Sequence, residues 1–377
     1  MILLVLYVVL IFINLNYRKS KLCFLSLLLY MWLLFGWSYG NADWNIYTNR
    51  YNNFEELSSR TEWLFTTLVR GGHFLGMEYR GFLIAISGIC LLLLAKTMFD
   101  LSSEPGLVLS LYAIFCFPMD VTQVRFFIAF SVVCFGFRYL FKYNETKQKK
   151  LLIKWIITIV VACNIHLLTI LTLVLLIPVF FKRKVTIAIT VVVNIIFVLA
   201  SSLSSKIFNI IALFLGEGKA ALVMNQASKY NLSTILYVWF KTLFIFAGFL
   251  TVYFCIKYFF KKYDKKYNIV LKADKKILNN QLEFTLDCNI IILVIMGLIT
   301  VTTDFYRVQQ IVVFMNYLIY SNYLQPHAKG KWKKNNLLII VPAVVFAFGA
   351  LYNLVLNGGN IETVFLPLFY NNVIFYN

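Results

Sequence analysis

Long runs of apolar residues, separated by short polar and basic segments, make up most of this chain. Runs of about 20 residues match the roughly 30 Å hydrocarbon core of a bilayer, whereas strands of a membrane barrel would alternate over about ten residues. The pattern therefore predicts an all-α protein, a polytopic bundle of transmembrane helices. About twelve crossings are predicted, near residues 1–16, 22–38, 82–99, 106–119, 124–141, 151–163, 166–181, 185–201, 232–260, 285–303, 308–324 and 336–355.

One apolar stretch, from Leu151 to Phe181, is too long for a single crossing. As one straight helix it would be about 46 Å long. Basic clusters at 147–150 and 182–184 flank it, and both favour the cytoplasm. The stretch should therefore leave the membrane and return, with its turn near residues 164–166 at or just below the outer surface.

With that turn, the charges sort to the two faces of the membrane. Of the 35 lysines and arginines, 22 fall in segments assigned to the cytoplasm, including a basic loop at 261–284. Residues 39–81 and 202–231 become long extracytoplasmic loops that could form interfacial helices or lids, and both termini lie outside. The whole chain, residues 1–377, is expected to be one integral membrane domain.

Composition supports this assignment. Hydrophobic residues make up 61% of the chain and charged residues 14%, against about a quarter charged in soluble domains. The net charge of +19 is explained by positive residues in cytoplasmic loops, so the expected partner is the bilayer and not nucleic acid. The seven cysteines form no CxxC pair, which makes a metal site or a disulfide framework a weak interpretation.

The candidate chemistry gathers at the outer end of the bundle. Arg125, His166 and Arg307 each lie in or near the first turn of a helix that enters from outside. One cation at that position is repelled by the helix dipole, at a cost of about 0.3–1 kcal/mol. Three cations at one face, together with free backbone N–H groups, form a positive pocket. Such a pocket suits phosphate, and arginine adds bidentate geometry. We infer a site for a phosphorylated ligand that arrives from the lipid phase.

The other candidate residues at the outer end of the bundle are Asp43, Tyr47, Tyr51, Glu62 and Asp304.

Each candidate also has a structural interpretation. Arg125 could extend to outer headgroups, and His166 could be a buried polar residue bonded to a carbonyl. Residues 59–62 (Ser-Arg-Thr-Glu) fit a capping box, which would give Glu62 a structural role. Asp304 could cap the helix that follows it. The two tyrosines could belong to an interfacial aromatic belt or stack on sugar rings.

Several common motifs are missing from the sequence. It contains no P-loop, no HExxH and no DxD pattern of metal-dependent sugar-nucleotide transferases. ATP-driven transport and zinc hydrolysis are therefore disfavoured, and we expect neither a metal nor a cofactor.

The ordered set of outer motifs resembles the EpsG-type and Wzy-type polysaccharide polymerases of bacterial capsule and exopolysaccharide systems. The matching pieces are Asp43-Trp44 with Tyr47 and Tyr51, Glu62-Trp63-Leu64, the segment Gln123-Val124-Arg125-Phe126-Phe127-Ile128-Ala129, which is similar to Q-x-R-x-x-x-A, Asn164-Ile165-His166, and Arg307. Two departures are Trp-Leu after Glu62, where the family often has Pro-Gly, and the lack of Ser-Ala after His166.

The resemblance implies a GT-C-like glycosyltransferase of the bacterial cytoplasmic membrane. It would join undecaprenyl-diphosphate-linked oligosaccharide repeat units on the outer face, on one pathway with a flippase and a chain-length regulator. Under this hypothesis Arg125 and Arg307 hold the diphosphate, and His166, Asp43 or Glu62 takes the proton of the acceptor hydroxyl. Tyr47 and Tyr51 would contact sugar.

Three other functions stay open at this point. An O-antigen-type ligase uses the same donor with another acceptor. A lipid-linked oligosaccharide flippase should carry polar residues through the membrane to both faces, whereas the candidates here crowd at one face. A sugar acyltransferase is disfavoured because His327 is the one histidine on the cytoplasmic side.

Overall fold

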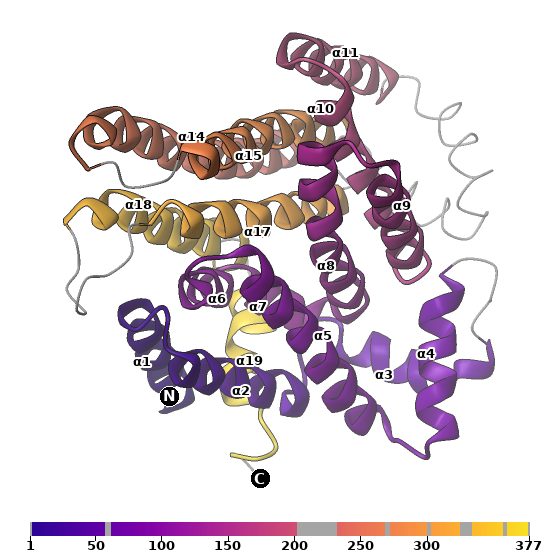
Figure 1. The fold of residues 1–377 in the computed structure, drawn as a ribbon. Coiled ribbons are helices and arrows are strands. Elements are labelled where there is room, and N and C mark those ends of the chain that lie inside the picture. The colour runs from indigo at the N-terminus through magenta and orange to yellow at the C-terminus, as the bar shows by residue number, and fades with distance from the viewer. Residues whose placement is uncertain are drawn as a thin grey trace.

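The structure, a computed structural model, describes residues 2–56, 62–201, 232–267, 272–299, 303–324, 334–356 and 360–375. These residues form helices and contain no strand, only an isolated bridge between Ser38 and Asn372 (Figure 1). The prediction of an all-α protein is confirmed. The outer loop predicted at 202–231 lies outside the described residues.

Most of the described elements are joined by short connections. The first half contains α1 (Ile2–Asn16), α2 (Lys21–Trp37), α3 (Trp44–Asn52), η1 (Phe54–Glu56), α4 (Trp63–Phe74), α5 (Tyr79–Leu101), α6 (Pro105–Ile114), α7 (Cys116–Thr122), α8 (Val124–Thr146), α9 (Lys149–Cys163), η2 (Leu167–Leu176), α10 (Ile177–Phe180) and α11 (Arg183–Ser201). The second half contains α14 (Leu232–Tyr267), α15 (Lys272–Ile291), η3 (Ile292–Val294), α16 (Ile295–Ile299), η4 (Thr303–Tyr306), α17 (Arg307–Asn322), α18 (Lys334–Leu351), η5 (Tyr352–Leu356), η6 (Ile361–Phe365) and α19 (Leu366–Tyr370).

Fewer helices qualify as membrane spans than the twelve expected. Among the described residues, five helices are long and apolar enough to cross, and six if α6 and α7, bent by 58° at their junction, count as one span. The described residues of all twelve predicted segments are largely helical, but several helices, such as α1 with 15 residues and α2 with 17, are short. At 1.5 Å per residue they reach only about 22–26 Å, less than the hydrocarbon core. The number of twelve crossings is therefore not confirmed.

The predicted turn in the apolar stretch 151–181 is present. Helix α9 ends at Cys163, and η2 and α10 return beside it. The Nζ atom of Lys147 donates to the carbonyl of Val179 at 3.3 Å, which places the two ends of the hairpin together. The turn itself consists of Asn164, Ile165 and His166.

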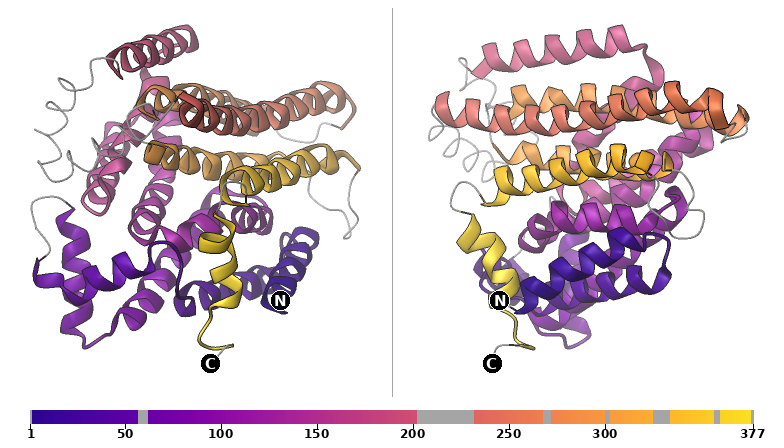
Figure 2. Two further views of the ribbon diagram at one scale, coloured as in Figure 1. Left: turned by 180° about the vertical axis from the view of Figure 1, so that it is seen from behind. Right: turned by 90° about the vertical axis from the view of Figure 1, so that its left-hand side faces the viewer.

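The centre of the bundle is formed by α6, α7 and α17. Every residue of α7, and every residue of α6 from Gly106 onward, is buried. The long helices stack roughly parallel around this centre (Figure 2, right). A close approach explains Gly106, because a Cβ there would lie 2.6 Å from the carbonyl oxygen of Arg18.

The described part of residues 39–81 contains α3, η1 and α4, at one side of the bundle, and the first turn of α5 (Figure 1). The Tyr51 hydroxyl donates to the Met77 carbonyl at 2.7 Å, and the Leu64 amide donates to the Asn164 carbonyl at 3.1 Å. These bonds fasten α3 to the segment before α5 and fasten α4 to the hairpin turn. The segment is thus a pair of docked helices.

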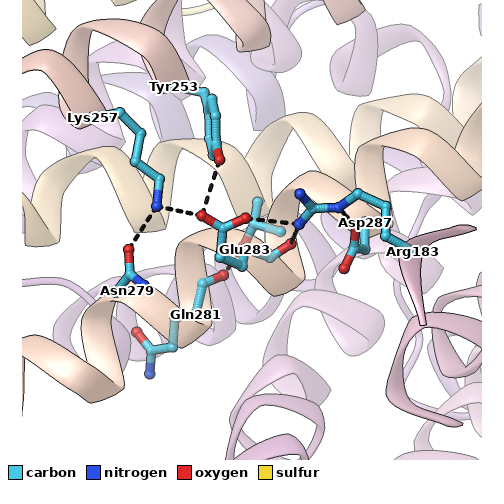
Figure 3. A network of polar contacts seen from close by, with 8 residues as sticks. Arg183, Tyr253, Lys257, Asn279, Gln281, Glu283 and Asp287 are labelled. Carbon is cyan, nitrogen blue, oxygen red and sulfur yellow. Dashed lines mark hydrogen bonds and ion pairs between the residues drawn. The ribbon is translucent and has the colours of Figure 1, made fainter. Parts of the chain in front are cut away.

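The segment predicted as a basic loop, 261–284, is helical in its described parts, since α14 runs to Tyr267 and α15 begins at Lys272. A polar network joins α11, α14 and α15 there (Figure 3). Glu283 accepts from Arg183 at 2.7 Å and from Tyr253 at 3.0 Å, and it is ion-paired with Lys257. Arg183 also pairs with Asp287.

Helix α8 connects this network to the opposite end of the bundle. Its last turn carries Glu145, which accepts a hydrogen bond from Gln281 of α15 at 2.6 Å. Its first turn carries Arg125. Glu145 lies 20 positions after Arg125, which corresponds to about 30 Å of helix, the thickness of the hydrocarbon core. Arg125 and the network around Glu283 therefore lie at opposite ends of a span.

Candidate active site

Glu62 is the centre of a polar cluster at the Arg125 end of α8. Its Oε2 atom lies 2.7 Å from Nη1 of Arg125. Its Oε1 atom accepts from the backbone N–H of Leu167 at 3.1 Å and lies 3.4 Å from Nδ1 of His166. One carboxylate thus joins α4, α8 and the α9–η2 hairpin, and brings together three of the residues predicted for the site.

The backbone positions Glu62 for this role. Glu62 is the residue that precedes α4 and has a left-handed φ of 60°, which is uncommon outside glycine. Its side chain makes no capping hydrogen bond. The capping-box interpretation is therefore wrong, because Glu62 lies at the helix cap and not three residues into the helix. The Asn164 carbonyl accepts from the amides of Leu64 and Phe65 instead.

Arg125 packs against side chains of the protein. Besides its ion pair with Glu62, its guanidinium lies 5.7 Å from the ring centre of Phe65 and 5.9 Å from that of Tyr47. Its side chain is only 20% exposed, and its Nε atom has no hydrogen-bond partner in the described part of the chain. A buried guanidinium N–H without a partner is costly, so it favours an acceptor from a ligand.

Both ring nitrogens of His166 are buried and make no geometric hydrogen bond to the described residues, although Nδ1 lies 3.4 Å from Glu62. The ring meets Phe126 edge-on at a centroid distance of 5.8 Å. Burial lowers the pKa of His166, Glu62 opposes this effect, and Arg125 and Arg307 add to it. The imidazole is therefore neutral at neutral pH.

Arg307 begins α17 and pairs with Asp304 at 3.0 Å. Asp304 lies within η4, and Tyr306 is the residue that precedes α17, so the interpretation of Asp304 as the cap of this helix is wrong. Arg307 is close enough to Arg125 and to His166 to affect both electrostatically. Its Nε atom has no hydrogen-bond partner among the described residues.

Asp43 and Tyr47 belong to the same electrostatic group. Asp43 precedes α3 and makes no side-chain capping bond. Burial raises its pKa, and the charges of Arg307 and Arg125 act in the opposite direction. Tyr51, one turn after Tyr47, has different neighbours: its ring stacks on His73 at 4.3 Å.

A third arginine was missed from the sequence. Arg50 of α3 interacts electrostatically with Arg125, Tyr47, Glu62 and Asp43. Burial lowers its pKa, and the neighbouring charge of Arg125 lowers it further. The spacing of three residues from Tyr47 to Arg50 on one helix was the signal that could have found it.

A comparison with protein families matches this chain to the EpsG family over residues 21–368. The chain belongs to the EpsG family. This membership confirms the resemblance seen in the sequence, and it indicates a multi-pass membrane protein of polysaccharide polymerisation. No curated protein and no solved structure matches the chain.

A carboxylate at the centre of this EpsG-family chain, Asp120, was also missed from the sequence. Asp120 of α7 is fully buried and accepts from the Tyr112 hydroxyl at 2.6 Å and from the Gln310 amide at 2.9 Å. Gln310 lies one turn after Arg307 on α17. Asp120 thus fixes α17, and with it Arg307, against α6 and α7.

We expect Asp120→Ala to lower the free energy of unfolding by about 1–3 kcal/mol, because it leaves two buried donors without an acceptor. Thermal unfolding of the purified protein would measure this loss. Asp120→Asn, which keeps an acceptor oxygen, should lose less. Asp100→Ala is the matched control, because Asp100 pairs with Arg138 and Lys96 at the surface, where ion pairs contribute little. Equal losses for Asp120→Ala and Asp100→Ala would contradict the assignment.

Proposed function

We propose that this chain is a metal-independent, GT-C-like glycosyltransferase of the bacterial cytoplasmic membrane. It polymerises undecaprenyl-diphosphate-linked oligosaccharide repeat units at the outer face, for capsule or exopolysaccharide synthesis. The observation that carries this proposal is the cluster of Glu62, Arg125 and His166 with Arg307 close by, in a chain of the EpsG family.

The cluster supports binding of a diphosphate. Arg125 and Arg307 each carry a buried Nε atom without a hydrogen-bond partner in the described ranges. Guanidinium groups bind phosphate oxygens in pairs of parallel hydrogen bonds. Their charges would stabilise the lipid diphosphate as it leaves, and this stabilisation needs no metal ion at the site.

In the proposed reaction an acceptor sugar hydroxyl attacks the anomeric carbon of the lipid-linked donor chain. The new glycosidic C–O bond forms as the bond from that carbon to the diphosphate oxygen breaks. The electron pair of the broken bond goes to the leaving lipid diphosphate, which the two arginines hold. The hydroxyl proton goes to a base on the protein.

The free Nε2 atom makes His166 our preferred base. Because Glu62 faces Nδ1, it favours the tautomer that carries its proton on Nδ1 and leaves Nε2 able to accept one. Glu62 then acts as a positioning residue, since both of its oxygens are already occupied. Asp43 is the second candidate base, because burial raises its pKa and a carboxylate with a raised pKa is a stronger base.

The outer location is supported by the distribution of charge. Arg125 and the network around Glu283 lie at opposite ends of α8. Lysine-rich segments favour the cytoplasm. The arginine cluster would then face outward, where a lipid-linked repeat unit arrives after it has crossed the membrane.

The proposal is tested with purified protein in lipid nanodiscs and lipid-diphosphate repeat units, with no other protein present. A ladder of products on a gel is expected, and it should survive treatment with a metal chelator. No ladder, with transport of the lipid across vesicles instead, would support a flippase and overturn the proposal. Transfer to a different acceptor without a ladder would indicate a ligase.

The pH dependence gives a further prediction. Because His166 must be neutral to accept a proton and burial lowers its pKa, the rate should be constant near pH 7. It should fall only below the ordinary histidine pKa of about 6.5. Glu62 raises this pKa, so Glu62→Gln should move the fall in rate to lower pH as well as reduce the maximal rate. Initial rates across a pH series would measure both changes, and a shift to higher pH would contradict the role given to Glu62.

A further inference from the structure

A cavity of about 650 Å³ lies between α3 and the start of α5. Trp44, Tyr51 and Asn52 line it from α3, and Glu78, Tyr79 and Arg80 line it from the other side. Its volume lies within the usual range of small-molecule sites, about 300–1,000 Å³. Arg125, His166 and Arg307 do not line it, so it is separate from the arginine cluster.

Aromatic rings form much of its wall. Trp44 meets Tyr79 edge-on at 5.1 Å, and the Arg80 guanidinium lies 5.2 Å from the Trp44 ring centre. Gly72 allows the close packing behind Tyr51, because a Cβ there would lie 2.7 Å from the Tyr51 hydroxyl. The rings are therefore held in place before a ligand binds.

Polar groups border the aromatic wall. Glu78 and Asn52 are exposed, and their side chains have no hydrogen-bond or ion-pair partner in the described part of the chain. Glu78 and Arg80 carry opposite charges, so the cavity lacks the excess of cations found at the arginine cluster. This balance favours a neutral polar ligand over a phosphate.

We propose that this cavity binds the glycan portion of the lipid-linked substrate. Trp44 is partly exposed at this wall, whereas Tyr51 and Tyr79 are buried behind it. The face of an aromatic ring carries partial negative charge and attracts the C–H groups of sugar rings. The carboxylate, amide and guanidinium groups suit sugar hydroxyls, which both donate and accept hydrogen bonds. A neutral oligosaccharide satisfies both sets of groups.

The position of α3 links the cavity to the arginine cluster. Tyr47 lies under the Arg125 guanidinium, and Tyr51, four residues later on the same helix, lines the cavity. Four residues advance about 6 Å along a helix, close to the size of one sugar ring. A glycan attached to a diphosphate at the arginines would thus reach the cavity directly. The assignment rests on the proposed function, because that function places the diphosphate at the arginines.

The test measures binding and turnover separately. Saturation-transfer NMR would follow the repeat-unit oligosaccharide, released from its lipid carrier by mild acid, as it binds the full-length protein in nanodiscs. Without a diphosphate donor no transfer can occur, so this experiment reports binding alone. We expect Trp44→Ala to weaken binding about tenfold, as the loss of one stacked ring implies. In the polymerisation assay the same change should raise KM about tenfold and leave kcat within about twofold.

Two variants control for misfolding and for general effects of removing an aromatic residue. Trp44→Phe keeps an aromatic face and should restore most of the binding. Trp63→Ala removes another tryptophan that begins an outer helix, but Trp63 is 51% exposed and does not line the cavity. It should bind the oligosaccharide as the unaltered protein does.

The possible outcomes separate this proposal from the proposed function. Equal binding by Trp44→Ala and the unaltered protein, or no binding by either, would overturn the cavity assignment even if polymerisation is observed. Oligosaccharide binding that depends on Trp44, without any product ladder, would support the cavity and overturn the polymerase function. Loss of binding in Trp63→Ala as well as Trp44→Ala would show a general effect and also overturn the assignment.

Discussion

Arg125→Ala is expected to lower the rate of polymer formation about 100- to 1,000-fold, the usual cost of removing one group that stabilises a developing charge. The guanidinium is 2.7 Å from Glu62, but its buried Nε atom has no hydrogen-bond partner in the described part of the chain. We therefore expect it to bind the leaving diphosphate more strongly as negative charge develops. Initial rates of ladder formation, at matched amounts of purified protein, would measure the loss.

Arg125→Lys and Arg183→Ala are the informative controls. Lysine keeps the charge but not the paired N–H geometry, so Arg125→Lys should recover only part of the rate. Arg183 is also ion-paired with two carboxylates, but at the opposite end of the span. Arg183→Ala should lower Tm and leave the rate per folded molecule within about twofold. A normal rate for Arg125→Ala would mean that this arginine does not bind the diphosphate.

Arg307→Ala should give a loss of similar size, because the same leaving group is involved. If both arginines hold one diphosphate, the fold-loss of rate in the double variant should be smaller than the product of the two single fold-losses. The effects of residues that act as a unit on the activation free energy are not additive. Independent, multiplicative losses would indicate separate sites.

The hydrophobic pattern and the basic clusters were enough to predict the helical bundle and the hairpin at 164–166. The hairpin could be predicted because the positive-inside rule acts on short segments of sequence. The number of crossings could not be predicted. A run of apolar residues looks the same in the sequence whether it forms a full span, a short helix or one half of a bent helix. The junction of α6 and α7, bent by 58°, is one example.

The sequence predicted which residues form the site but not which of them contact one another. Sequence placed Glu62, Arg125 and His166 at one face, and the structure joins all three through one carboxylate. The left-handed backbone of Glu62, at the start of α4, left no signal in the sequence. Its carboxylate accepts from Leu167, which lies 105 positions later in the chain.

Asp120 and Arg50 were missed for a similar reason. Asp120 lies in an apolar run with no polar partner nearby in the sequence, because its partner Gln310 is 190 residues later. Arg50 resembles an ordinary surface charge on a short polar helix until Arg125 and Glu62 are packed beside it. Long-range pairing of this kind leaves no local pattern.

His166→Ala is expected to lower the rate about 100- to 10,000-fold, the range for loss of a general base. Its Nε2 atom is buried without a hydrogen-bond partner among the described residues, while Nδ1 faces Glu62. Imidazole added to His166→Ala should restore part of the rate, with a pH dependence set by the pKa of the added imidazole. A purely structural histidine would show no such rescue. If His166→Ala retains more than about a tenth of the rate while Asp43→Asn abolishes it, the proton goes to Asp43, and His166 serves only to position Glu62 beside Arg125.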